Sequence, residues 1–140
     1  MTKKVHVIGS GISSLSAASF LAKAGYDVQI FEKNPTIGGR ARQFETQGFV
    51  FDMGPSWYWM PDVFEKFYQQ FGYTTADFYE LKRLDPSYRV YWPDQSYTNV
   101  PAQMPQLEEW FESIEPGSAL QLQAFLKDAA YKYKVGMEDL

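Results

Sequence analysis

The chain lacks cysteine entirely and contains one histidine, His6. Disulfide bonds, iron–sulfur clusters and thiolate zinc sites are therefore excluded, because each requires a cysteine sulfur. One histidine is too few to build a histidine metal site, so we predict that the protein binds no metal. The net charge of −4 gives no electrostatic reason to expect a nucleic-acid partner, since such binding depends on Lys and Arg neutralising phosphates.

Long hydrophobic runs are also missing. The apolar run after Lys3 and Lys4 covers only residues 5–8 before Gly9 interrupts it. A secretory signal needs a core of roughly 7–15 apolar residues. No stretch approaches the ~20 apolar residues of a membrane-spanning helix. We therefore expect a cytoplasmic protein, which can still lie against a membrane surface.

Aromatic residues, in contrast, are abundant. There are ten Tyr, eleven Phe and four Trp, and most of them follow residue 43. Packing in a bulky core accounts for most of these rings, and a large flat apolar ligand is the alternative.

The first third of the chain predicts a parallel βαβ unit. Residues 4–9 form a short β-branched run that glycine stops, residues 13–24 carry an apolar face and end before Gly25, and residues 27–32 form a second strand. A strand, a crossover helix and a strand within about 30 residues define this unit. The fold class is thus α/β, with a Rossmann-like βαβ unit as part of a doubly wound sheet.

Mixed elements are predicted for the rest of the chain. The Gln47-Gly48 pair joins a hairpin of residues 42–46 and 49–52. A helix starting at Pro61 carries an aromatic stripe up to Phe71, and Ser118 is expected to cap a later helix. The remaining candidates are strands at 79–84, 88–92 and 96–100 and a helix at 107–114.

We divide the chain into residues 1–57, the first part of a dinucleotide-binding domain, and residues 58–140, the beginning of an α+β substrate or membrane-associating domain. A doubly wound sheet needs more parallel strands than the two found. The expectation is therefore a fragment of a longer enzyme. A complete small α+β domain is the alternative.

The junction between the first strand and the first helix carries a phosphate-binding motif. Gly9 permits a tight turn, Gly11 lets a pyrophosphate approach the backbone, and the helix that follows presents free N–H groups. The third position of the motif is usually Gly or Ala, and here it is Ser14. The predicted contacts from this segment are Gly9, Ser10, Gly11, Ile12, Ser13 and Ser14.

Three further elements complete the predicted site. Glu32 ends the second strand and lies 21 residues after Gly11. A carboxylate at this position accepts hydrogen bonds from the ribose hydroxyls and disfavours NADP. An exposed strand-end acid is the alternative. Gly38-Gly39-Arg40 then favours FAD over NAD, because two glycines allow close approach and the arginine offsets phosphate charge. Lys33 is a further predicted cofactor-binding residue. The Gly54-Pro55-Ser56 turn is predicted to contact a flavin through its backbone, with an ordinary turn as the alternative. Arg42 is a weaker candidate, with a surface ion pair as its alternative.

These motifs together resemble the flavin amine oxidase superfamily, and within it the bacterial-type phytoene desaturases and related carotenoid desaturases. The opening residues 7–18, Glu32-Lys33 and residues 38–42 are shared by many flavoproteins. Residues 48–56 (GFVFDMGPS), 60–64 (MPDVF) and 84–94 (LDPSYRVYWPD) narrow the likeness. Ser14 departs from the glycine usual in that family.

The resemblance implies an FAD-dependent oxidoreductase that desaturates a lipid-soluble C40 polyene such as phytoene. A quinone or oxygen would act as electron acceptor, and the enzyme would lie peripherally on the inner face of the cell membrane. The helix at 61–71 is a candidate for that contact, with core packing as its alternative. No catalytic residue is identified. Other enzymes of the superfamily, such as an amine oxidase, a carotenoid isomerase or a flavin monooxygenase, and a non-catalytic dinucleotide-binding fragment stay open.

Overall fold

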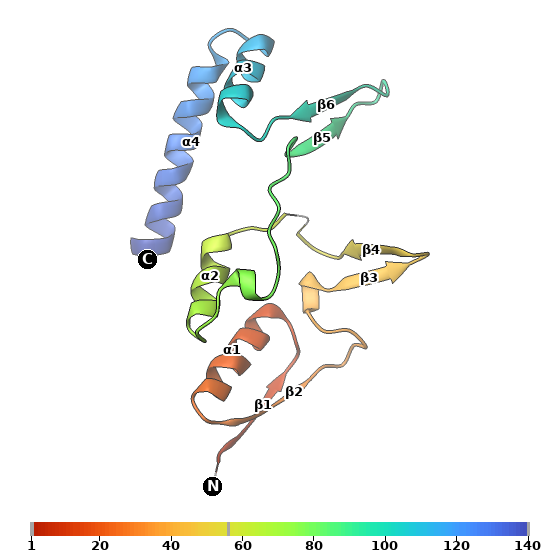
Figure 1. Cartoon of the computed structure of the whole chain (residues 1–140), viewed down its shortest axis with the longest axis vertical. Coiled ribbons are helices and arrows are strands. Elements are labelled where there is room, and N and C mark those ends of the chain that lie inside the picture. The colour runs from red at the N-terminus through yellow and green to blue at the C-terminus, as the bar shows by residue number, and fades with distance from the viewer. Residues whose placement is uncertain (1, 56, 140) are drawn as a thin grey trace. The chain divides into compact units, whose positions relative to one another are not determined.

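The computed structural model describes residues 2–55 and 57–139 and divides into two compact units, Met1–Glu80 and Leu81–Leu140. The first unit opens with β1 (Lys4–Ile8), α1 (Ile12–Lys23) and β2 (Asp27–Phe31), labelled in Figure 1. The two strands pair in parallel, with Lys4 opposite Asp27 and Ile8 opposite Phe31. The predicted βαβ unit is confirmed, since each element lies within one residue of its expected bounds.

One face of this two-stranded sheet is covered and the other is open. Val5 and Val7 of β1 are half-buried, and Ala18 of α1 is buried, as expected where a crossover helix lies on a parallel sheet. Ile8 points to the other face and is 79% exposed. Phe31, its partner on β2, is 50% exposed, and the remaining residues of this open face are polar: Lys4, His6, Asp27 and Gln29.

A β-hairpin and a helix follow in the first unit. β3 (Gln43–Thr46) pairs antiparallel with β4 (Phe49–Asp52), and Gln47 and Gly48 between them both have positive φ, as the tight hairpin turn requires. The predicted hairpin is confirmed. α2 (Pro61–Gln69) then begins at its proline as expected, and a short 3-10 turn, Thr75–Asp77, follows it.

The aromatic stripe around α2 packs against α1. The rings of Phe67 and Phe71 lie 5.9 and 5.3 Å from the ring of Phe20, measured between centroids. These contacts favour core packing, one of the two roles that the sequence allows for the stripe. They also explain why the first unit extends to Glu80, beyond the functional boundary predicted at residue 57. That functional division stays a prediction.

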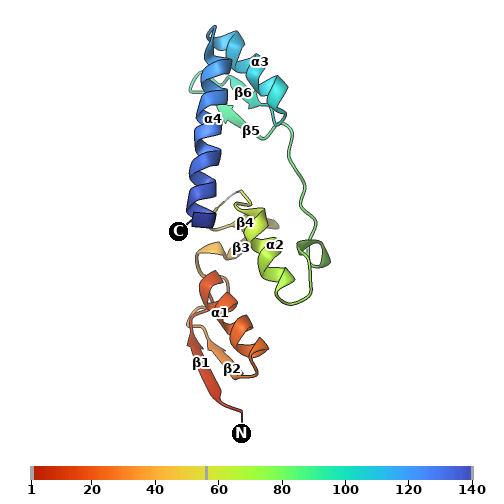
Figure 2. The same cartoon turned by 90° about the vertical axis from the view of Figure 1, so that its left-hand side faces the viewer.

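The second unit contains a hairpin and two helices. β5 (Tyr88–Tyr91) pairs antiparallel with β6 (Tyr97–Val100), while α3 (Met104–Ile114) and α4 (Ser118–Lys134) lie side by side, as Figure 2 shows. A π-helical turn, Val135–Asp139, continues α4. None of the helices in residues 2–55 and 57–139 combines the length and apolar character that a bilayer crossing requires.

The strand predicted at residues 79–84 is absent, and this prediction was wrong. The segment is irregular and has no neighbouring strand with which to pair. Its side chains make other contacts: the Tyr79 hydroxyl bonds to that of Tyr58, and Arg83 Nη2 donates to the Ala102 carbonyl at 2.9 Å. Alternating residues cannot form a strand without a partner for their backbone groups.

The cap predicted at Ser118 is also wrong. Gly117 is the N-cap of α4, in a left-handed conformation at φ 88°, and Ser118 is the first helical residue. The Glu112 carboxylate accepts hydrogen bonds from the backbone N–H groups of Gly117 and Ala119, at 2.8 and 3.2 Å. These bonds hold the pKa of Glu112 below its usual value. The acid on the preceding helix therefore provides the cap expected of serine.

Candidate dinucleotide-binding site

The bend between β1 and α1 has the backbone that the phosphate motif requires. Gly9 adopts φ 94°, a conformation that favours glycine, and its N–H donates to the Phe31 carbonyl at 2.7 Å. Gly11 is the N-cap of α1 and provides no side-chain cap. The first N–H groups of α1 have no partner inside the helix, and they carry the positive end of its dipole. This end of the helix is suited to an anion.

Space is left open where an anion would approach Gly11. A Cβ atom built on Gly11 would meet no protein atom within 4 Å, and its φ of −70° is accessible to any residue. Glycine is therefore not needed here for the fold itself. The absent side chain instead keeps the space in front of the helix N-terminus free, as close approach of a pyrophosphate demands.

Serine at the third motif position lies beside the first glycine without crowding it. Even a Cβ atom at Gly9 would lie 3.9 Å from Ser14 Oγ, an ordinary contact distance. The departure from the usual small residue therefore leaves the bend intact.

Glu32 faces the bend and bonds to it directly. One carboxylate oxygen accepts from the Ser10 N–H at 2.8 Å and from Ser10 Oγ at 2.7 Å. The other accepts from the Asn34 N–H at 2.9 Å and from Asn34 Nδ2 at 2.7 Å. These four bonds, the one from the Asn34 backbone first among them, lower the pKa of Glu32 to about 2. The carboxylate is thus ionised at neutral pH and holds Ser10, which is 1% exposed, in the bend.

Two glycines bring the loop after β2 against this bend. Gly38 N–H donates to the Ser10 carbonyl at 2.9 Å, and Gly38 forms a parallel bridge with Gly11. A Cβ atom on Gly39 would lie 3.0 Å from the Gly11 Cα, closer than side chains normally come. Arg42 Nη1 donates to the Gly39 carbonyl at 3.0 Å, so this arginine braces the loop.

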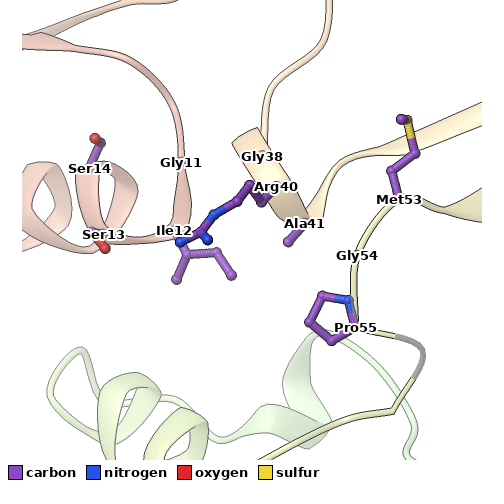
Figure 3. Close-up of a pocket in the computed structure, with 10 residues that line it drawn as sticks. All are labelled: Gly11, Ile12, Ser13, Ser14, Gly38, Arg40, Ala41, Met53, Gly54 and Pro55. Carbon is purple, nitrogen blue, oxygen red and sulfur yellow. The ribbon is translucent and has the colours of Figure 1, made fainter.

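A cleft of about 740 Å³ lies between these segments. Figure 3 shows the N-terminal turn of α1 on one side, the 3-10 turn Gly39–Ala41 next to it, and the Gly54-Pro55 segment opposite. The Arg40 side chain extends from that turn towards the start of α1 in the same view. The volume of the cleft is within the roughly 300–1,000 Å³ typical of small-molecule sites. The cleft is lined by Gly11, Ile12, Ser13, Ser14, Gly38, Arg40, Ala41, Met53, Gly54 and Pro55.

Eight of the residues predicted from the sequence line this cleft, and the others lie elsewhere. Gly9, Ser10, Gly39 and Glu32 shape the bend behind it, while Lys33 is exposed and does not line it. Ser56 lies outside the described residues. Ala41 and Met53 line the cleft and were not among the predicted residues, because side-chain chemistry does not mark residues that contribute only backbone and apolar surface. Contact of any of these residues with a cofactor stays a prediction.

Gly54→Ala is expected to destabilise the first unit. A Cβ atom at Gly54 would lie 2.3 Å from the Arg40 carbonyl oxygen, which is part of the backbone and cannot rotate away. We expect a loss of about 1–3 kcal/mol in the free energy of unfolding, as for other overpacked sites. Denaturant unfolding measures it, with Gly136→Ala as the control, because a Cβ atom there meets nothing within 4 Å. Equal stability of the two variants would contradict the close approach of these segments.

The comparisons with known proteins agree with this geometry. Residues 7–71 match the family model described as an NAD(P)-binding Rossmann-like domain. The fold and the cleft therefore define a Rossmann-like dinucleotide-binding domain.

Two curated relatives are similar to nearly the whole chain. The chain is 46% identical over 133 residues to a carotenoid 3,4-desaturase of Haloarcula japonica, covering 95% of this chain and 27% of the relative. It is 41% identical over 132 residues to a 4,4'-diapophytoene desaturase of Staphylococcus aureus, covering 94% of this chain and 26% of the relative. Over nearly its whole length the chain is similar to these two desaturases, and it spans about a quarter of the length of these curated relatives.

A solved structure is a weaker match. The crystal structure of a CLA-producing fatty acid isomerase from P. acnes aligns with 52% of this chain and 18% of that chain, at a TM-score of 0.41 and 24% identity. A likeness at that level carries no argument about function.

Proposed function

We propose that this chain forms the first part of the FAD site of an oxidoreductase that desaturates a C40 polyene such as phytoene. The observation that carries the proposal is the open space at Gly11, in front of the helix N-terminus and beside a carboxylate bonded to the same bend. One relative named above is a carotenoid 3,4-desaturase and the other is a 4,4'-diapophytoene desaturase, so both introduce double bonds. A bound FAD would supply the hydride acceptor that such a desaturation needs, for an allylic hydride that leaves together with a proton from the adjacent carbon.

The residues fit an adenine dinucleotide as follows. The amides at the start of α1 and the Arg40 guanidinium face the cleft and offset the charge of a pyrophosphate. Glu32 would bind the ribose hydroxyls, and its lowered pKa keeps it an acceptor at neutral pH. Gly38, Gly39, Gly54 and Pro55 allow the backbone to pass close to the ligand.

Ribose binding at Glu32 would require an exchange of hydrogen bonds. A carboxylate offers about four acceptor positions, and protein donors use all four here. Ser10 Oγ and Asn34 Nδ2 belong to side chains, which can rotate, whereas the two backbone donors are fixed. We propose that ribose hydroxyls replace one or both side-chain donors and leave the backbone bonds in place.

The domain division, the electron acceptor and the location of the protein are proposed on the same basis. Residues 1–57 would belong to the FAD domain and residues 58–140 to the beginning of the substrate domain. A quinone or oxygen would take the electrons. Because a C40 polyene dissolves in lipid, the protein would act from the cytoplasm at the inner face of the cell membrane. Co-sedimentation with lipid vesicles tests this last point, and a protein that stays in the supernatant would contradict it.

The central experiment measures cofactor and reaction separately. We expect the purified chain, or the full-length protein that carries it, to show the visible absorbance of oxidised flavin after incubation with FAD. Expression of the full-length gene in a host that accumulates phytoene should convert phytoene into coloured products. Flavin binding without conversion of phytoene would contradict the proposed substrate class only. The absence of flavin binding would overturn the proposal as a whole.

A further inference from the structure

A second cavity adjoins the cleft. It measures about 200 Å³ and has four aromatic walls, Trp57, Tyr58, Trp59 and Phe64. We refer to this cavity as the aromatic chamber. It shares the residues Ile12, Ala41, Gly54 and Pro55 with the cleft. A molecule in the aromatic chamber would therefore lie directly against the dinucleotide site.

The lining of the aromatic chamber is almost free of charge. Asp52 is the one Asp, Glu, Lys, Arg or His among the described lining residues, and its Oδ1 already accepts a hydrogen bond from Gln43 Nε2 at 2.8 Å. The cavity offers ring faces and apolar surface, which favour a hydrocarbon over a polar or ionic ligand.

Tyr58 is held in place as one wall. Its ring centroid lies 4.9 Å from that of Phe64 and 5.8 Å from that of Tyr79, and its hydroxyl bonds to the Tyr79 hydroxyl. Burial and the bond to Tyr58 raise the pKa of Tyr79 to about 12, so this hydroxyl stays neutral at physiological pH. The contacts with Tyr79 and Phe64 thus hold the Tyr58 ring in place as a wall of the aromatic chamber.

From these contacts we infer that the aromatic chamber binds one end, or a short stretch, of an unsaturated hydrocarbon chain. The inference rests on the proposed function and adds the place where the polyene lies. At about 200 Å³ the cavity is below the roughly 300–1,000 Å³ of sites that enclose a whole drug-sized ligand, so most of a long polyene lies outside it. Flat sp² segments suit its ring faces, which stack on planar groups better than on flexible saturated chains.

The test uses parinaric acid, a conjugated tetraene whose emission rises in apolar surroundings. Trp59→Ala should weaken its binding roughly tenfold, the effect of about 1.4 kcal/mol lost with one stacked aromatic wall. Trp92→Ala is the matched control, because Trp92 is 50% exposed against 62% for Trp59 and lies in the second unit. Trp59→Phe retains a ring and should restore most of the affinity.

Three outcomes would overturn the inference. The first is that Trp59→Ala and Trp92→Ala weaken the binding of parinaric acid equally. The second is that stearic acid, the saturated acid of the same chain length, binds as tightly as parinaric acid. The third is full displacement of parinaric acid by FAD. The last result would assign the aromatic chamber to the flavin ring. A chain that binds parinaric acid through Trp59 but does not bind FAD would instead contradict the proposed function, so the two failures are distinguishable. Circular dichroism of each variant confirms that the fold is retained.

Discussion

Gly11→Val is expected to weaken FAD binding roughly 10- to 100-fold while the chain stays folded. The valine side chain would enter the open space in front of α1, where no protein atom lies within 4 Å of the added Cβ. Overpacking of a fitted site costs about 1–3 kcal/mol, and each 1.4 kcal/mol is a factor of ten in affinity. Titration with FAD, followed by flavin fluorescence, measures the change.

Stability provides the control for this variant. The backbone of Gly11 is extended, at φ −70° and ψ 169°, so valine fits without strain. Replacing glycine by an apolar residue at an N-cap costs up to about 1 kcal/mol. Gly54→Ala should show the opposite behaviour, a large loss of stability, because its Cβ atom meets backbone. Unchanged FAD affinity in Gly11→Val would show that the pyrophosphate does not lie at this bend.

Glu32→Arg is expected to lower both cofactor affinity and stability. The arginine removes the acceptor of four hydrogen bonds and places a cation beside the Ser10 and Asn34 donors. It also removes the proposed ribose acceptor. We expect at least a tenfold weaker FAD affinity, corresponding to about 1.4 kcal/mol or more. Thermal unfolding and FAD titration measure the two effects separately.

A milder pair of variants tests the specificity of this effect. Glu32→Gln retains one acceptor oxygen but turns an amide N–H₂ towards donors, so it should weaken binding less than arginine. Glu45→Gln, on exposed β3, is the control and should change neither quantity. If all three variants bound FAD like the original chain, Glu32 would be a structural residue only.

Acid should remove the contribution of Glu32 to stability. Its pKa is about 2 in the folded chain against an ordinary value of 4.5. A lowered folded-state pKa means that the stabilisation is fully present above about pH 4.5 and is lost as the pH falls towards 2. The difference in melting temperature between the original chain and Glu32→Gln should therefore shrink over this interval. A constant difference would show that the charge of Glu32 does not stabilise the bend.

The cofactor and its contacts stay predictions, whereas the geometry of the bend between β1 and α1 was predicted from the sequence alone. The glycines at 9 and 11, the strand before them and the helix after them predicted the bend, and the spacing to Glu32 predicted that the acid would face it. The structure adds what the acid contacts. Asn34 was not expected as a partner, because nothing in its position marks it as a donor to a residue two positions earlier.

Local sequence determined the elements whose signals are local. β-branched runs, a helical stripe, Gln47-Gly48 and Pro61 act within a few residues, and the βαβ unit, the β3–β4 hairpin and the start of α2 follow from them. Tertiary structure decided the features that depend on groups outside the element itself. Residues 79–84 form no strand because none pairs with them, Glu112 caps α4 from the preceding helix, and the aromatic chamber exists because Ile12 and Ala41 line one cavity with Phe64. A pattern along the chain records the periodicity of each element, but not which distant groups satisfy its hydrogen bonds or fill the space beside it.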